Sequence, residues 1–140
     1  MNFLSDSIED TIKIAERFAK KLKSGDCIAL VGELGSGKTV FTKGIAKGIG
    51  VKDARYVNSP TFVIIKEYKA KMPLYHFDLY RLNHCLSLDA LSYDEYFYGD
   101  GVTVIEWADK IRRLLPKKYT EVRLTVSGEN SRKIEIIKHR

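Results

Sequence analysis

The strongest constraint on this chain comes from residues 32–39, Gly-Glu-Leu-Gly-Ser-Gly-Lys-Thr, which fit the P-loop pattern of Gly, four residues and Gly-Lys-Thr. Glycines in such a loop let the backbone adopt positive φ and turn its N–H groups toward phosphate oxygens. Lys38 can reach the β- and γ-phosphates, and the Thr39 hydroxyl can ligate Mg²⁺. The loop therefore predicts a site for a nucleoside triphosphate and its metal. The loop residues expected to hold the nucleotide are Gly35, Ser36, Gly37, Lys38 and Thr39.

The segments on either side of the loop support this interpretation. Residues 26–31 form a short apolar run, which is typical of a buried parallel strand. Residues 40–50 place Phe41, Ile45 and Ile49 on one face of a helix. Strand, glycine loop and helix in this order present a helix N-terminus to a phosphate group. The context thus favours a P-loop over an incidental glycine-rich turn.

Size and composition fit one domain spanning residues 1–140. The chain is 44% hydrophobic, enough for a buried core. Its net charge of +6 allows contact with an acidic partner such as RNA without requiring one. The two cysteines lack metal-site spacing, and Cys27 is expected to be a buried small hydrophobe. No apolar run approaches the roughly 18 residues of a membrane helix, so a cytoplasmic protein without a membrane partner is expected.

The rest of the chain predicts an α/β fold. We expect a P-loop NTPase with a mixed, mostly parallel sheet flanked by helices, followed by a C-terminal antiparallel β-hairpin in which apolar and polar residues alternate. Ser7 and Asp10 resemble a capping pair at the start of the first helix. The expected elements are helices at 7–23, 40–50, 87–98 and 108–115, and strands at 26–31, 61–68, 73–81, 102–107, 122–126 and 134–136.

Two carboxylates follow apolar runs and are candidates for the metal site. Asp78 and Glu106 each come at the end of a predicted strand. Since the carboxyl ends of strands in an open α/β sheet converge on one crevice, both acids are expected near the P-loop. His76 is either a base or a hydrogen-bonded structural histidine, and Trp107 either lies along the nucleotide or fills core. Thr61 is a candidate γ-phosphate switch because it follows the P-loop helix.

Four segments in this order resemble the bacterial TsaE (YjeE) family. The segments are 32–39, Asn-Ser-Pro-Thr-Phe at 58–62, Tyr-His-Phe-Asp-Leu-Tyr-Arg-Leu at 75–82 and Ile-Glu-Trp-Ala-Asp at 105–109. Members of this family are small P-loop ATPases required for N6-threonylcarbamoyladenosine (t6A) in tRNA. The resemblance extends over most of the chain and is weakest between residues 83 and 98.

The resemblance implies a role for each matching residue. Lys38 would hold the phosphates, Thr39 and Glu106 would ligate Mg²⁺, and Asp78, at a Walker B-like position, would orient water or the metal shell. The implied catalytic residues are Asp78, Thr61 and Glu106. Further implied nucleotide contacts are Val40, Trp107 and Asp109, with Ser7 and Arg132 near the adenosine.

The resemblance also implies cofactors and partners. The cofactors would be ATP and Mg²⁺, and the partner would be a TsaD–TsaB-like complex that ATP hydrolysis resets between turnovers. Any contact with tRNA would be indirect or weak.

Two other functions remain open at this level. A small-molecule kinase on the same fold would need an arginine-bearing lid, for which Arg112 and Arg113 are the nearby candidates. A pure ATP-gated binding module would hold nucleotide with negligible hydrolysis. A GTPase is disfavoured because Asn58, Asn83 and Asn130 are not followed by the Lys-x-Asp of a guanine-reading motif.

Overall fold

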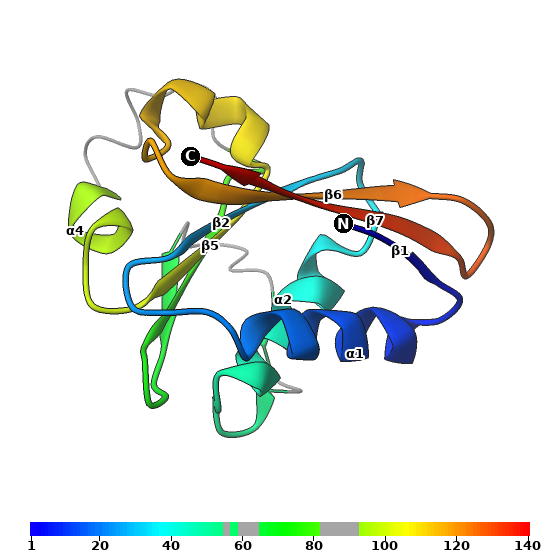
Figure 1. Ribbon diagram of the computed structural model, residues 1–140, viewed down its shortest axis with the longest axis horizontal. Coiled ribbons are helices and arrows are strands. Elements are labelled where there is room, and N and C mark those ends of the chain that lie inside the picture. The colour runs from blue at the N-terminus through cyan, green and yellow to red at the C-terminus, as the bar shows by residue number, and fades with distance from the viewer. Residues whose placement is uncertain (55–56, 59–64, 82–92) are drawn as a thin grey trace.

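The computed structural model describes residues 1–54, 57–58, 65–81 and 93–140, which form one mixed sheet with helices on both faces (Figure 1). In the described part of the chain, no helix is long and apolar enough to cross a membrane. In chain order the elements are β1 (Asn2–Ser5), α1 (Ile8–Ala19), β2 (Cys27–Val31), α2 (Lys38–Gly48), β3 (Ile65–Tyr68), β4 (Leu74–Asp78), α4 (Tyr93–Phe97), β5 (Val102–Glu106), the 3₁₀ helix η2 (Ala108–Leu114), β6 (Tyr119–Val126) and β7 (Arg132–His139).

The sheet is parallel in its middle and antiparallel at both edges. Its strand order is β1-β7-β6-β2-β5-β4-β3. The pairs β6–β2, β2–β5 and β5–β4 are parallel, whereas β3–β4, β6–β7 and β1–β7 are antiparallel. The predicted α/β class and C-terminal hairpin are confirmed. Through β6, the hairpin continues the main sheet and lengthens it by two strands.

The predicted elements differ from the observed ones mainly at their ends. The first helix is shorter than 7–23, and the hairpin strands are longer than predicted. The last short helix has 3₁₀ geometry and is broken at Ile111, where φ is −130°. Strand β1 was not predicted, because its four residues form a strand only by pairing with β7. The parts of the predicted strand 61–68 and helix 87–98 that precede residues 65 and 93 lie outside the described residues.

Strand register brings the loop and both candidate acids to one edge of the sheet. Strand β2 ends at Val31, directly before the loop. Strands β4 and β5 run parallel to β2 and end at Asp78 and Glu106, which are paired in register. Strand β5 lies between β4 and β2, and on the β2 side Glu106 is paired with Leu30. The carboxyl ends of these three strands therefore meet beside the P-loop, as expected for an open α/β sheet.

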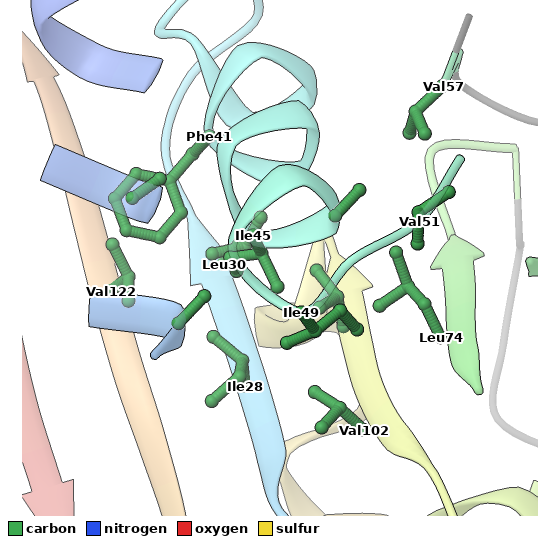
Figure 2. Close-up of a cluster of buried hydrophobic side chains, with 14 of the residues drawn as sticks. Ile28, Leu30, Phe41, Ile45, Ile49, Val51, Val57, Leu74, Val102 and Val122 are labelled. Carbon is green, nitrogen blue, oxygen red and sulfur yellow. The ribbon is translucent and has the colours of Figure 1, made fainter. Parts of the chain in front are cut away.

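Alternating side chains divide the core into two clusters. On one face of the sheet, Ile28 and Leu30 pack against Phe41 and Ile45 of α2 (Figure 2). On the other face, the second cluster joins strand residues to α4 and η2 and includes Cys27. Burial, with a smaller contribution from Asp26, raises the pKa of the Cys27 thiol to about 12, so this side chain is the buried small hydrophobe that was predicted.

Two glycines let α2 pack closely against α1. A Cβ at Gly44 would lie 2.4 Å from the Cβ of Ala15, and one at Gly48 would lie 2.6 Å from the Cβ of Ala19. Both distances are shorter than packed carbon atoms allow. Because α2 begins at the P-loop, this close contact also fixes the helix that presents the loop.

A buried carboxylate ties η2 to β6. Glu121 is fully buried and accepts hydrogen bonds from Arg112 Nη1, at 3.0 Å, and from Arg123 Nε. Burial raises the pKa of Glu121, but the hydrogen bonds from the two guanidinium groups outweigh it, so the pKa lies below its ordinary value of 4.5. The stability contributed by this carboxylate is present above pH 4.5 and is lost as the pH falls through the lowered pKa.

We expect Glu121→Gln to lower the free energy of unfolding by about 1.5–3 kcal/mol at pH 7, because it weakens hydrogen bonds between charged groups. Urea unfolding of both proteins from pH 7 to pH 3 measures this difference. The gap between them should narrow below about pH 4.5, where the wild-type carboxylate also loses its charge. A gap that stays constant over this range would show that the charge of Glu121 is not what stabilises the fold.

Candidate functional site

The P-loop has the backbone conformation of a phosphate cradle. Gly35 and Gly37 adopt φ values of +80° and +103°, in the left-handed region that glycine tolerates best. Gly37 is also the N-cap of α2, so the helix N-terminus opens onto the loop. A Cβ at Gly32 would lie 2.4 Å from Ser36 Oγ and 2.6 Å from the Leu124 carbonyl oxygen, so the loop packs on β6 only with glycine there.

One buried polar atom in this cradle fits a phosphate ligand. Ser36 Oγ is buried and has no hydrogen-bond partner among the described residues. Buried hydroxyl groups normally have partners, so an unpaired one in a glycine loop at a helix N-terminus is consistent with a place for an anion. The residues present thus fit the nucleotide that the sequence predicts.

Lys38 is held at the loop by its backbone carbonyls and by an aromatic ring. Its Nζ donates hydrogen bonds to the carbonyl oxygens of Gly32, at 2.6 Å, and Glu33, at 2.9 Å. It also lies 3.9 Å from the centroid of the Trp107 ring. Burial lowers the pKa of Lys38, while the nearby charges of Glu106, Asp109 and Asp78 oppose that shift. The ammonium group therefore lies among the loop, Trp107 and the candidate acids.

The carboxylate that contacts Thr39 is Glu106. Thr39 Oγ1 donates to Glu106 Oε1 at 2.9 Å, with Oε2 at 3.2 Å. Glu106 is 2% exposed, so this contact is sheltered from bulk water. A hydroxyl and a carboxylate at the start of a P-loop helix are the oxygen ligands that Mg²⁺ takes from proteins, alongside phosphates and waters. The described residues contain no cluster of three or more His, Cys, Asp or Glu that could bind a metal without a substrate.

Asp78 lies beside Glu106 but makes different contacts. Its Oδ1 accepts a hydrogen bond from the Tyr80 backbone N–H at 3.0 Å. Burial is the main cause that raises the pKa of Asp78, and the charge of Glu106 adds to it, against the Tyr80 hydrogen bond, His76 and Lys38. The structure thus brings both candidate acids together, and Glu106 is the one that accepts the Thr39 hydrogen bond.

Trp107 closes one side of the site. It has an unusual φ of +63° and lies 5.1 Å, centroid to centroid, from the Tyr80 ring. Lys110 Nζ donates to the Tyr80 carbonyl oxygen at 2.5 Å. These contacts hold the indole next to Lys38, and therefore next to the loop.

The other predicted nucleotide contacts are spread more widely. Arg132, at the start of β7, donates to the Gly35 carbonyl oxygen at 3.2 Å and so reaches the loop. Val40 lies half-buried in the first turn of α2. Ser7 accepts a hydrogen bond from the Asp10 backbone N–H at 3.0 Å, which confirms the predicted helix cap, while its contact with adenosine stays a prediction. Thr61 lies outside the described residues.

His76 is one of two residues, with Trp107, whose role the sequence left open. It is fully buried, and its Nε2 lies 2.5 Å from Glu106 Oε2. Two-residue spacing from Asp78 along one strand was the signal that both side chains share a face. The sequence contained no signal for contact with Glu106, because that contact depends on β4 and β5 being neighbours.

Thr39→Val should remove the effect of Mg²⁺ on nucleotide binding while leaving the fold intact, because valine has a similar shape but no hydroxyl group. Titrating ATP with and without Mg²⁺ measures this effect, and the two affinities should become equal. Thr42→Val is the matched control, since this buried hydroxyl on the same helix donates to the Lys38 carbonyl oxygen at 2.9 Å and does not contact Glu106 in the structure. An undiminished Mg²⁺ effect in Thr39→Val would exclude the hydroxyl as a metal ligand.

Comparison with known proteins identifies similar chains. A family model described as threonylcarbamoyl adenosine biosynthesis protein TsaE matches residues 5–134. A Bacillus subtilis protein named tRNA threonylcarbamoyladenosine biosynthesis protein TsaE is 46% identical over 127 residues, which cover 90% of this chain and 78% of the relative. An Aquifex aeolicus protein of the same name is 39% identical over 134 residues, covering 94% and 91%. The crystal structure of Bacillus subtilis YdiB superposes with a TM-score of 0.83 at 38% identity, over 99% of this chain and 84% of that one.

Proposed function

The chain belongs to the TsaE family of tRNA threonylcarbamoyladenosine biosynthesis, and we propose that it is the Mg²⁺-dependent, ATP-hydrolysing subunit of that modification machinery. The observation that carries this proposal is the contact between Thr39 Oγ1 and Glu106 Oε1, 2.9 Å apart at the head of α2. This contact lies beside a glycine loop with the backbone of a phosphate cradle. The hydroxyl, the carboxylate and the glycine loop are the kinds of protein group with which a P-loop ATPase binds Mg²⁺ and phosphate.

Each side chain has a distinct task in this proposal. Lys38 Nζ, which hydrogen-bonds to the loop carbonyl oxygens of Gly32 and Glu33, would bind the β- and γ-phosphates, where its charge would offset theirs. Thr39 and Glu106 hold Mg²⁺, which, when bound, neutralises charge that develops on the phosphate oxygens. Asp78, paired in register with Glu106, would orient the attacking water or the metal shell. Trp107 lies against Lys38, with 3.9 Å between the ring centroid and Nζ, and so forms one side of the site.

The kinase alternative is less well supported. A kinase lid needs arginines free to close over phosphates. Of the two candidates, Arg112 is engaged in an ion pair with the buried Glu121 at 3.0 Å, which leaves the exposed Arg113. Moving Arg112 would break a contact that ties η2 to β6. As membership of the TsaE family implies, the proposed partner is a complex of the TsaD–TsaB kind, and the proposed product of hydrolysis is free phosphate.

The test is reconstituted t6A formation by a TsaD–TsaB complex with this chain, tRNA and a preformed, activated threonylcarbamoyl donor, with ATP compared against a non-hydrolysable analogue. If hydrolysis resets the complex, ATP should support many modified tRNAs per complex, and the analogue about one. Equal yields with ATP and the analogue would contradict the proposed role of hydrolysis. A phosphorylated small molecule in place of free phosphate would favour the kinase, and equal use of GTP would contradict the preference for ATP.

A further inference from the structure

His76 has an unusual environment for a buried histidine. It lies on β4 between Leu74 and Asp78 on the same face of the sheet, and it is paired in register with Val104 of β5. Its Nε2 is 2.5 Å from Glu106 Oε2, whereas its Nδ1 is buried without a hydrogen-bond partner among the described residues. Among the described residues, Glu106 is thus the one hydrogen-bonding partner of the imidazole.

We propose that His76 is a positioning residue that fixes the Glu106 carboxylate for the metal. The proposal rests on the proposed function, since it concerns the same acid. A carboxylate accepts hydrogen bonds and does not donate them, so the Nε2 atom carries the hydrogen. His76 holds Oε2 while the Thr39 hydroxyl lies closer to Oε1, at 2.9 Å. With both oxygens held, the carboxylate cannot rotate about its last torsion, and Oε1 stays directed toward Thr39.

Packing alone does not account for a histidine at this position. Two of its neighbours on this face, Leu74 and Val104, are apolar, so an apolar side chain at position 76 could pack against them. It would also avoid burying an Nδ1 atom that lacks a partner, which is unfavourable. The N–H group toward Glu106 is what a histidine adds. Groups that orient metal ligands in this way typically strengthen metal binding by about 10–100-fold.

Two substitutions separate positioning from a structural role. The amide nitrogen of glutamine can reach the place of Nε2, whereas that of asparagine reaches only the place of Nδ1. Both are polar side chains in the same buried position, so both should lower the free energy of unfolding by a similar amount. Positioning requires that His76→Gln keep the Mg²⁺ affinity and that His76→Asn lose it.

The measurement is Mg²⁺ affinity at a fixed, saturating nucleotide concentration, by calorimetry or by the fluorescence of Trp107, the only tryptophan in the chain. We expect His76→Asn to weaken Mg²⁺ binding by about 10–100-fold and His76→Gln to stay within about threefold of the wild type. Nucleotide affinity without Mg²⁺ should be unchanged in both variants. Thr103→Val is the control, because it removes a partly buried hydrogen bond to the Tyr96 carbonyl oxygen on the other face of the sheet. It should lower Tm without changing Mg²⁺ affinity.

A double-mutant cycle then tests whether His76 acts through Glu106. In the Glu106→Gln background, His76→Asn should cause no further loss of Mg²⁺ affinity, and a further loss of the same size would overturn the proposal. Wild-type Mg²⁺ affinity in His76→Asn, or equal losses in both single variants, would overturn it as well. If His76→Asn does not fold, His76→Gln still decides, since a loss of tenfold or more contradicts positioning. A wild-type protein whose nucleotide binding ignores Mg²⁺ would overturn this inference and the proposed function together.

Discussion

Glu106→Gln is expected to abolish the tightening of ATP binding by Mg²⁺ and to stop ATP hydrolysis. The substitution keeps the size of the side chain and one oxygen but removes the charge next to Thr39 and His76. We expect Mg²⁺ affinity at saturating nucleotide to fall by at least about 100-fold, because Glu106 is the proposed ligand itself and changes to groups that only orient a ligand already cost about 10–100-fold. Calorimetric titration of Mg²⁺ into the protein–nucleotide complex measures this directly. Binding of ATP without the metal should be retained, because the phosphate cradle is unchanged.

The control for this variant is Glu67→Gln, which removes the same charge from an exposed position on β3. It should leave Mg²⁺ affinity as in the wild type. If Glu106→Gln also left it unchanged, Asp78, paired with Glu106 in register, would be the principal metal-site acid. Asp78→Asn would then show the loss expected for Glu106→Gln.

Lys38→Ala is expected to weaken ATP binding by at least about 10–100-fold, because hydrogen bonds to charged groups contribute roughly 1.5–3 kcal/mol each. The loss should be larger for ATP than for AMP, because the side chain is expected to reach the β- and γ-phosphates and not the α-phosphate. Competition binding of ATP, ADP and AMP to the variant measures this order.

Lys47→Ala is the matched control for Lys38→Ala. It removes the same charge from the same helix, where Lys47 makes an exposed ion pair with Glu16 at 3.8 Å. Such surface pairs contribute little, so its nucleotide affinities should match the wild type. Equal ATP affinity in Lys38→Ala and Lys47→Ala would contradict the assignment of the loop as a phosphate cradle.

The sequence predicted best what short stretches determine by themselves. The apolar run before the loop, the helical spacing of Phe41 and Ile45, and the cap at Ser7 are local patterns, and all three are present in the structure. Strand β1 has no such pattern, because it forms only against β7, at the other end of the chain. The 3₁₀ geometry of η2, next to the left-handed Trp107, likewise had no signal in the spacing of its apolar residues.

For the candidate site, too, the sequence predicted the general position but not the contacts between side chains. The two strand-ending acids could be placed near the loop from general rules for parallel sheets. These rules did not predict which of the two acids contacts Thr39 and His76. Both hydrogen bonds to Glu106 depend on which strands are neighbours and on their register. The contact of Arg132 with the Gly35 carbonyl oxygen depends in the same way on β6 lying next to β2.

The most direct test of the account is phosphate release from ATP by the wild-type protein, measured with and without Mg²⁺ and with and without a TsaD–TsaB complex. We expect slow release by the protein alone, a clear increase on adding the complex, and no release without Mg²⁺ or with Glu106→Gln. Release that is independent of Mg²⁺, or that Glu106→Gln leaves unchanged, would contradict the claim that this loop and this carboxylate form an ATP-hydrolysing site.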